Sequence, residues 1–527
     1  MRSATVRRSR AVVAVLATVA LLAGCGRGGG AVIDDPPANP AVVHSVAGAL
    51  RGTVAADHRY FAGIPYAAAP VGPLRWQPPA PVAAWTGLRD ATRPGERCVQ
   101  DVSTDVDRRR TSEDCLFLNV WTPPPSSEPR PVLVWIHGGG FFNGSGDIYD
   151  ARRLAGRGGI VVVTINYRLG ALGFLAHPAL GRDGAIGNFG LTDQQAALRW
   201  VRDNIAAFGG DPDRVTIAGE SAGGMSVCDH LVAPGSAGLF GAAIIQSAPC
   251  QAQYDLPTAE QTSTAYAAEV GCADPAVAAQ CLRSLPAEKL QHPLLYARFG
   301  TERLSGPVIG TPTLPVNPVV GIADGKAAQV PVMIGTNTDE FTLFTALQYL
   351  RGRPIDAVHY PDLLAEAFGP AAGAVAARYP PERFGGNVAL AYSAAMTAGD
   401  FACVADFIAD AHDDAPVYAY EFNDRAAPAP EPLREAPFPV GAAHSLELRY
   451  LFDVGGAPPL NAAQQRLSDE MIGFWSRFVA TGEPGPGWPP MTDERSGQRM
   501  SLQSDGNRVI TDYEQRHECA FWAGLRR

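Results

Sequence analysis

The sequence predicts an α/β fold, a single large domain in which helices flank a central, mostly parallel sheet. Two apolar runs, Pro131–Ile136 and Ile160–Ile165, are typical of buried strands, and a third strand is expected at Arg214–Ala218. Between the second and third strands, apolar residues recur on one helical face until two glycines end the segment: Leu191, Ala196, Leu198, Val201 and Ile205, then Gly209 and Gly210. Strands that alternate with helices in this way pair in parallel and are covered on both faces.

The composition is that of a folded, acidic protein. Of the 527 residues, 46% are hydrophobic and only 18% are charged, so the chain can bury a large core. The formal net charge is -10, and such a surface gives no support for nucleic-acid binding, which needs clustered basic residues. No internal repeat is found.

The N-terminus has the pattern of an export signal. Residues 1–24 combine a basic start, an apolar run from Ala11 to Ala23 and small residues before Cys25. The ending Leu22-Ala23-Gly24-Cys25 resembles a bacterial lipobox, which implies lipidation of Cys25 and attachment to the cell envelope through that lipid alone. An ordinary secretory signal, leaving a secreted protein, is the alternative. The Gly- and Pro-rich stretch 25–43 reads as a flexible tether before a domain at 44–527.

The cysteine content also fits an exported protein. Nine cysteines are present, and setting Cys25 aside leaves eight, an even number that is consistent with disulfides in an oxidising compartment. Spacing alone does not give their connectivity. No pair has the CxxC arrangement of a zinc site, so no metal is expected, and Cys228 and Cys250 could equally be buried free thiols.

A candidate nucleophile, Ser221, lies between glycines in the stretch AGESAGG, directly after an apolar strand. A helix is expected to begin at Met225, so the chain would turn sharply from strand to helix and expose the serine hydroxyl. Gly219 and Gly223 fit this interpretation, because larger side chains would collide across so tight a turn. A serine between glycines is also common in ordinary loops, so the motif needs support from the rest of the chain.

A glycine-rich turn supplies candidate groups for binding a negative oxygen. The strand Pro131–Ile136 runs directly into His137-Gly138-Gly139-Gly140. The N–H groups of Gly139 and Gly140, together with that of Ala222, are predicted to stabilise the charge that develops on the carbonyl oxygen during acyl transfer. A merely flexible glycine turn is the alternative. His137 is expected to shape this loop without transferring protons.

Several longer motifs resemble the type-B carboxylesterases, the α/β-hydrolase family that includes the cholinesterases. The matching segments occur in order from about His44 to near the C-terminus: FAGIPYAAAPVGPLRW, SEDCLFLNVWTP, VWIHGGGF, NYRLG, GNFGLTDQQAALRWVRDNIAAFGGDP and GESAGG. The resemblance implies an α/β-hydrolase fold and a serine hydrolase that cleaves carboxylic esters through an acyl-enzyme.

The same resemblance identifies the remaining catalytic residues. The segment VMIGTNTDEFTLF matches the family's acid-bearing strand end, and its acid is Glu340. Composition alone does not distinguish Glu340 from Asp339, and Phe341 stands where the family usually has glycine. The segment GAAHSLELRYLF matches the histidine loop and makes His444 the base. The chain order serine, glutamate, histidine is the one expected of this fold.

The resemblance also implies three disulfides, which join Cys98 to Cys115, Cys272 to Cys281, and Cys403 to Cys519. Cys228 and Cys250 lack a usual counterpart in the family, and a fourth disulfide between them is a hypothesis.

The expected substrate is a small, neutral and moderately apolar carboxylic ester, hydrolysed without metal or cofactor. Cholinesterases carry a tryptophan between the first paired cysteines, whereas the loop VQDVSTDVDRRRTSED has no aromatic residue, so a choline-ester specialist is not expected. Glu220 could favour a positive charge or order water and His444. Lipase, thioesterase or amidase action with the same residues is an alternative. So is a catalytically silent, cholinesterase-like adhesion or binding protein, because function does not follow from fold.

Overall fold

The computed structural model describes residues 39–102, 110–181, 185–300, 302–412, 415–492 and 497–525. The expected signal peptide at 1–24, the lipidation site Cys25 and most of the tether at 25–43 lie outside these residues, as does part of the loop between Cys98 and Cys115.

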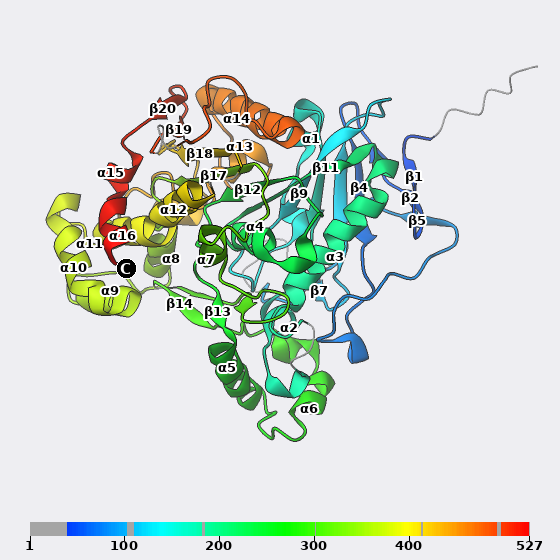
Figure 1. The fold of residues 1–527 in the computed structure, drawn as a ribbon, viewed down its shortest axis with the longest axis horizontal. Helices are drawn as coiled ribbons and strands as arrows, with labels where there is room; N and C mark the ends of the chain where they lie inside the picture. The colour runs from blue at the N-terminus through cyan, green and yellow to red at the C-terminus, as the bar shows by residue number, and fades with distance from the viewer. Residues whose placement is uncertain are drawn as a thin grey trace, which may run out of the picture. The chain divides into compact units, whose positions relative to one another are not determined.

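An 11-stranded sheet forms the centre of the domain. The strands from β10 to β19 in sheet order are parallel, and antiparallel strands extend both edges. In Figure 1 the N-terminal strands in blue lie at one edge, and the C-terminal strands in red lie at the other. In sheet order the strands are β20 (Arg508–Ile510), β19 (Arg499–Leu502), β18 (Val417–Phe422), β17 (Val332–Asn337), β12 (Ala242–Gln246), β11 (Gly210–Glu220), β9 (Arg130–Ile136), β10 (Val161–Ile165), β8 (Phe117–Thr122), β4 (Arg59–Pro65) and β3 (Thr53–Val54). The mostly parallel α/β sheet predicted from the sequence is therefore confirmed.

Both faces of the sheet are buried, which explains why its strands are apolar along their whole length. In β9, Val134 belongs to one hydrophobic cluster, while its neighbours Leu133 and Trp135 belong to another. Successive side chains of a strand point to opposite faces, so the two clusters are the two sides of the sheet.

Helices cover each face. The first side carries α2 (Gly170–Phe174), α3 (Phe189–Asn204), α4 (Ala222–Val232), α5 (Leu256–Glu269), α6 (Ala278–Ser284), α7 (Pro318–Ala323) and α12 (Cys403–Ala411). The second side carries α1 (Arg152–Gly158), α13 (Leu448–Leu451) and α14 (Ala462–Thr481). A third cluster involves α8 (Thr342–Leu350), α9 (Tyr360–Phe368), α10 (Ala372–Arg378), α11 (Val388–Met396) and α16 (Cys519–Leu525), with α15 (Tyr513–His517) preceding α16.

The predicted elements are present, and two of them begin earlier than expected. β9 and β10 start within one residue of the expected positions, whereas β11 begins at Gly210 rather than at Arg214. The helix expected before the two glycines is α3, and Gly209 after it adopts a left-handed conformation. The helix after the serine begins at Ala222 rather than at the expected Met225. Gly223 and Gly224 are poor helix formers, which made a later start plausible. Both positions nevertheless require glycine, because a Cβ at Gly223 would lie 2.0 Å from the carbonyl oxygen of Ile136 and one at Gly224 would lie 2.9 Å from that of Gln246.

Four disulfides connect the domain: Cys98–Cys115, Cys228–Cys250, Cys272–Cys281 and Cys403–Cys519. Cys228 lies on α4 and Cys250 follows β12, so this pair ties the helix after Ser221 to the neighbouring strand. The structure thus contains a Cys228–Cys250 disulfide rather than two free thiols.

One helical segment among the described residues, Val388–Ala411, is long and apolar enough to cross a membrane. Within it, 72% of the most apolar stretch is buried inside the protein, as expected for a core helix. Its middle is a π-helical turn at Thr397–Ala402, a feature that often occurs beside functional sites.

Candidate active site

Ser221 occupies a strained turn between β11 and α4. Its φ of 57° and ψ of -124° are unfavourable for a residue with a side chain, and its N–H donates to the carbonyl of Gln246 on the next strand, at 3.0 Å. Backbone strain of this kind persists only where the surrounding packing enforces it. The strand-to-helix turn predicted from the sequence is therefore present, with the serine at its apex.

The two glycines around Ser221 are required by backbone packing. A Cβ at Gly219 would lie 2.4 Å from the carbonyl of Gly223, and a Cβ at Gly223 would lie 2.0 Å from the carbonyl oxygen of Ile136. Gly138 has a similar role, because its Cβ would lie 3.1 Å from Ser221 Cβ. The glycine-rich turn after β9 and the serine turn thus pack directly against each other.

Gly223→Ala is therefore expected to destabilise the protein by about 1–3 kcal/mol, because overpacking against backbone cannot be relieved by a side-chain rotation. Urea unfolding of the purified variant measures this loss. Gly373→Ala is the matched control, because Gly373 lies in α10 with no atom within 4 Å of its would-be Cβ. There alanine should be neutral or stabilising by up to about 1 kcal/mol. Equal stabilities for the two variants would contradict this account.

The glycine-rich turn presents N–H groups that the protein does not use. Gly139 and Gly140 have φ values of 106° and 61°. In the part of the chain that the structure describes, neither their N–H groups nor that of Ala222, the first residue of α4, donates a hydrogen bond to the protein. Gly140 and Ala222 are buried, where unpaired N–H groups are rare, and Ala222 directly follows the candidate nucleophile. This arrangement suits stabilisation of an oxyanion.

His137 supports the turn, as expected. Its Nδ1 lies 2.8 Å from the carbonyl oxygen of Gly138, and its ring stacks on Tyr167 with 4.4 Å between the centroids. Burial lowers the pKa of His137 to about 4, so the ring is neutral at physiological pH. These contacts fit a structural role.

His444 and Glu340 are in direct contact. His444 Nδ1 lies 2.6 Å from Glu340 Oε2, while the other carboxylate oxygen accepts a hydrogen bond from the N–H of Asn337 at 2.7 Å. The acid follows β17, and the histidine precedes α13. The carboxylate therefore fixes the tautomer and orientation of the imidazole, leaving Nε2 to face the rest of the site.

The second nitrogen of His444 lies close to Glu220, the residue before Ser221. Nε2 is 3.1 Å from Glu220 Oε1, yet among the described residues it forms no hydrogen bond. Ser445, the neighbour of His444, donates its hydroxyl hydrogen to Glu220. Within the same residues, Ser221 Oγ makes no hydrogen bond to the imidazole; such bonds commonly tighten only in a substrate complex.

Phe341 does not disturb the acid. Its φ of -77° is helical, so this position needs no glycine, and its buried ring packs 4.9 Å from that of Phe344. Thr397, in the π-helical turn, accepts a hydrogen bond from the N–H of Phe341 at 3.0 Å. The departure from the family pattern is therefore accommodated by packing and a backbone contact next to Glu340.

Sequence reasoning missed three contributors to the site. Glu447 is fully buried and accepts a hydrogen bond from the side chain of Asn337 at 2.7 Å. The rings of Phe344 and Phe401 both lie close to the imidazole of His444, with centroid distances of 5.1 and 5.2 Å. Glu447 lies three residues after His444 in HSLELRYLF, in the turn that precedes α13, and this nearness in sequence was the only local signal.

Three buried carboxylates control the charge of His444. Burial by itself lowers the pKa of His444, but the negative charges of Glu220 and Glu340 outweigh this effect and raise the pKa to about 9. Burial, followed by repulsion from the same two carboxylates, raises the pKa of Glu447 to about 8. Burial and charge repulsion thus favour the protonated form of Glu447, and the neighbouring carboxylates favour the protonated form of His444.

The activity is accordingly expected to rise with pH through the pKa of His444, because a general base must be neutral to accept a proton. Glu220→Gln removes the carboxylate nearest Nε2, so the pKa of His444 falls. The rise of kcat/KM with pH should then occur about one pH unit lower. Glu447→Gln is the control, because an amide replaces a carboxyl whose neutral form is already favoured, and the rise should move less. Equal shifts in the two pH profiles would contradict this assignment.

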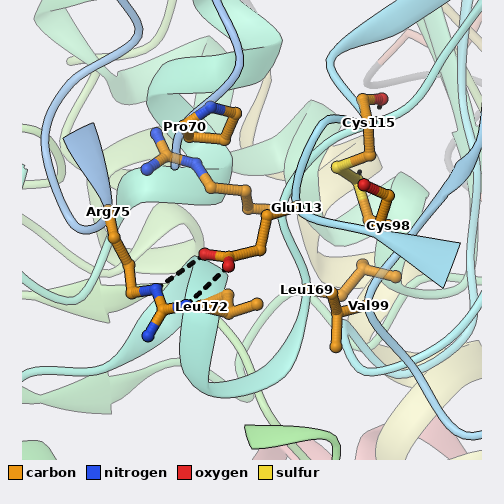
Figure 2. A pocket seen from close by; sticks show the side chains of 10 residues that line it. Pro70, Arg75, Cys98, Val99, Glu113, Cys115, Leu169 and Leu172 are labelled. Carbon is orange, nitrogen blue, oxygen red and sulfur yellow. Dashed lines mark hydrogen bonds and ion pairs between the residues drawn. A yellow bond between two sulfur atoms is a disulfide. The ribbon is translucent and has the colours of Figure 1, made fainter. Parts of the chain in front are cut away.

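A small void near the first disulfide is not a substrate site. Figure 2 shows Arg75 and Glu113 hydrogen bonded to each other among the residues that line it, together with the Cys98–Cys115 disulfide. The guanidinium Nε lies 2.7 Å from Glu113 Oε1. The void of about 10 Å³ has room for about one water, and the neighbouring Nη1 of Arg168 has no protein partner within the described residues. No group of three or more His, Cys, Asp or Glu side chains suited to a metal occurs in the described part of the chain.

Comparison with known proteins gives one consistent result. The Carboxylesterase family matches residues 39–522. The chain is 35% identical to fumonisin B1 esterase of Sphingopyxis macrogoltabida, over 89% of this chain and 87% of that protein. It is 34% identical to para-nitrobenzyl esterase of Bacillus subtilis (strain 168), over 86% and 93%, and 34% identical to acylcarnitine hydrolase of Mus musculus, over 90% of each.

The fold agrees with these matches. A solved structure of PNB esterase superimposes with a TM-score of 0.77 at 32% identity, covering 91% of this chain and 99% of that one. The chain therefore belongs to the carboxylesterase family and is a carboxylic ester hydrolase with an α/β-hydrolase fold.

Proposed function

We propose that the protein cleaves carboxylic esters through an acyl-enzyme formed on Ser221, with His444 as the base and Glu340 as its orienting acid. The observation that carries this proposal is the 2.6 Å contact between His444 Nδ1 and Glu340 Oε2, beside a serine held in a strained strand-to-helix turn. Glu340 and His444 are 104 residues apart in sequence yet in contact, and Nε2 of His444 lies 3.1 Å from the carboxylate of Glu220, the residue before Ser221. This arrangement supports the roles that acyl transfer requires of the three residues.

In the first half of the reaction, Ser221 Oγ attacks the ester carbonyl carbon while its proton passes to His444 Nε2. The carbonyl oxygen becomes an oxyanion, which the N–H groups of Gly139, Gly140 and Ala222 stabilise. The imidazolium then gives its proton to the departing alkoxide, and the alcohol leaves. In the second half, His444 takes a proton from water while the water oxygen attacks the acyl-enzyme. The resulting oxyanion collapses, Ser221 Oγ leaves and takes the proton back from His444, and the carboxylic acid is released.

The groups beside His444 favour an apolar acyl or alcohol part next to the reacting carbonyl. Phe344 and Phe401 place aromatic rings near the imidazole and no charged group of their own. Such rings exclude water and strengthen the interactions of the oxyanion with its N–H donors. This supports the expectation of neutral, moderately apolar esters at the reacting end.

A fluorophosphonate probe tests the assignment, because it reacts covalently only with an activated serine. The purified, oxidised protein should be labelled, and peptide mapping should place the label on Ser221. The heat-unfolded protein is the control and should remain unlabelled. A folded protein that takes up no label would favour the alternative of a catalytically silent binding or adhesion protein. Matched oxygen esters, thioesters and amides then compare the rates for each bond type.

We also propose that the protein is exported and anchored in the bacterial cell envelope by a lipid on Cys25. The basic and apolar leader before Cys25 supports this, as do four disulfides, which persist in oxidising compartments. Metabolic labelling with palmitate in a bacterial host should mark the native chain but not Cys25→Ser. An unlabelled native chain in the culture medium would instead indicate ordinary secretion.

A further inference from the structure

A cavity of about 780 Å³ is lined by Phe142, which follows the glycine-rich turn, and by Gln348 of α8 and the loop after it; we call it the rim cavity. Its wall includes the apolar side chains of Phe142, Ile355 and Leu363 and the cationic side chains of Arg351 and Arg353. A volume of this size holds a small organic molecule with a dozen or more heavy atoms.

Two elements connect the rim cavity to the reacting groups. Phe142 follows the glycine-rich turn by two residues, so the cavity begins where that turn ends. On α8, Phe344 lies against the ring of His444, and Gln348, four residues later, lines the cavity. One turn of helix separates these two side chains, a rise of about 6 Å. The glycine-rich turn and α8 thus both run from the candidate reacting groups to the wall of the rim cavity.

Some charged side chains in the wall of the rim cavity have an ion-pair partner within the described residues, and Arg353 does not. Arg351 lies 3.0 Å from Glu302 Oε1, which also accepts a hydrogen bond from Gln348 at 2.7 Å. Asp356 is engaged by His359, whose Nδ1 and backbone N–H lie 2.8 and 2.9 Å from Asp356 Oδ1. Arg353 is exposed, and no carboxylate of the described residues lies within ion-pair distance of it. The wall therefore contains one cation that lacks a protein counter-ion.

We propose that the rim cavity binds the far end of the substrate, and that Arg353 recognises a carboxylate there. This inference rests on the proposed function and adds the substrate class: esters whose reacting end is apolar and whose other end carries a carboxylate. The guanidinium donates two parallel hydrogen bonds to such a group, while the methylene chain lies on the apolar wall formed by Phe142, Ile355 and Leu363.

A matched pair of substrates tests the proposal. The mono-4-nitrophenyl ester of adipic acid and 4-nitrophenyl hexanoate have the same six-carbon acyl chain and differ only in a terminal carboxylate or methyl. Arg353→Gln should lower the ratio of kcat/KM for the adipate ester to that for the hexanoate ester by about two- to fivefold, within the range measured for exposed ion pairs. High salt should lower the same ratio in the native protein, because it screens the pair.

Arg202→Gln is the control variant, because it removes the same charge from an exposed position on α3 that has Asp203 as its neighbour. It should leave the ratio unchanged. Leu363→Trp places a larger side chain in the rim cavity. It should raise KM for both six-carbon esters and leave KM for 4-nitrophenyl acetate unchanged.

The outcomes separate the two proposals. Failure of the native protein to hydrolyse 4-nitrophenyl hexanoate would overturn the proposed function itself. Hydrolysis of both esters with a ratio that Arg353→Gln does not change would overturn the assignment of Arg353 alone. An equal loss on both esters would give Arg353 a structural role and would likewise overturn carboxylate recognition.

Discussion

Ser221→Ala is expected to lower kcat for 4-nitrophenyl esters by about 10⁶-fold, because no other group can form the acyl-enzyme once the hydroxyl is gone. The fold should remain intact. The strained turn is enforced by Gly138, Gly219 and Gly223, whose contacts do not involve the serine hydroxyl. Steady-state kinetics and urea unfolding, measured on the same preparation, distinguish loss of chemistry from loss of structure.

Ser226→Ala provides the matched control, since it removes a hydroxyl from α4 little more than one turn further along. That hydroxyl accepts a hydrogen bond from Gln194 at 3.0 Å, so its loss should cost stability rather than turnover. The catalytic assignment would be wrong if Ser221→Ala retained more than a few per cent of the native kcat. It would also be wrong if Ser226→Ala were equally inactive.

The serine turn could be predicted from the sequence because its determinants are local. An apolar strand, two flanking glycines and a following helix lie within about twenty residues, and each restricts the backbone for a reason that a sequence shows directly. The start of the helix was misjudged because its first turn contains two glycines. Packing on Ile136, which is distant in sequence, determines that start.

The electrostatics of the site could not be predicted in the same way. Glu220 and Ser445 are 225 residues apart, and Asn337 and Glu447 are 110 apart, yet both pairs are hydrogen bonded. Contacts between such distant positions depend on how the strands are ordered in the sheet, which leaves no periodic pattern in the sequence. The raised pKa of His444 follows from the negative charges of Glu220 and Glu340, which the fold brings beside the imidazole from distant positions.

The choice of acid shows the same limit at two adjacent residues. Sequence composition does not distinguish Asp339 from Glu340, but the structure turns them in opposite directions. Asp339 Oδ2 lies 2.9 Å from Nε of Arg425, a largely exposed side chain, and accepts a hydrogen bond from the N–H of Ala442. Glu340 is fully buried against His444. Only the second carboxylate is placed to stabilise an imidazolium.

This difference leads to a three-way prediction. Glu340→Gln should lower kcat by about 10⁴-fold, because the amide keeps the shape of the acid but loses the charge that orients and stabilises the protonated imidazole. His444→Ala should lower kcat by about 10⁶-fold, because the proton acceptor itself is lost. Asp339→Asn alters the neighbouring carboxylate that pairs with Arg425, and it should change kcat by no more than a few fold.

Kinetics of the three variants on one neutral ester, each checked for folding by circular dichroism, decide between the two acids. If Asp339→Asn were the more damaging of the two acid substitutions, the acid would be assigned to the wrong residue. If Glu340→Gln were as damaging as His444→Ala, the carboxylate would do more than orient the ring, because a pure orienting role leaves the imidazole able to accept a proton in a fraction of its conformations.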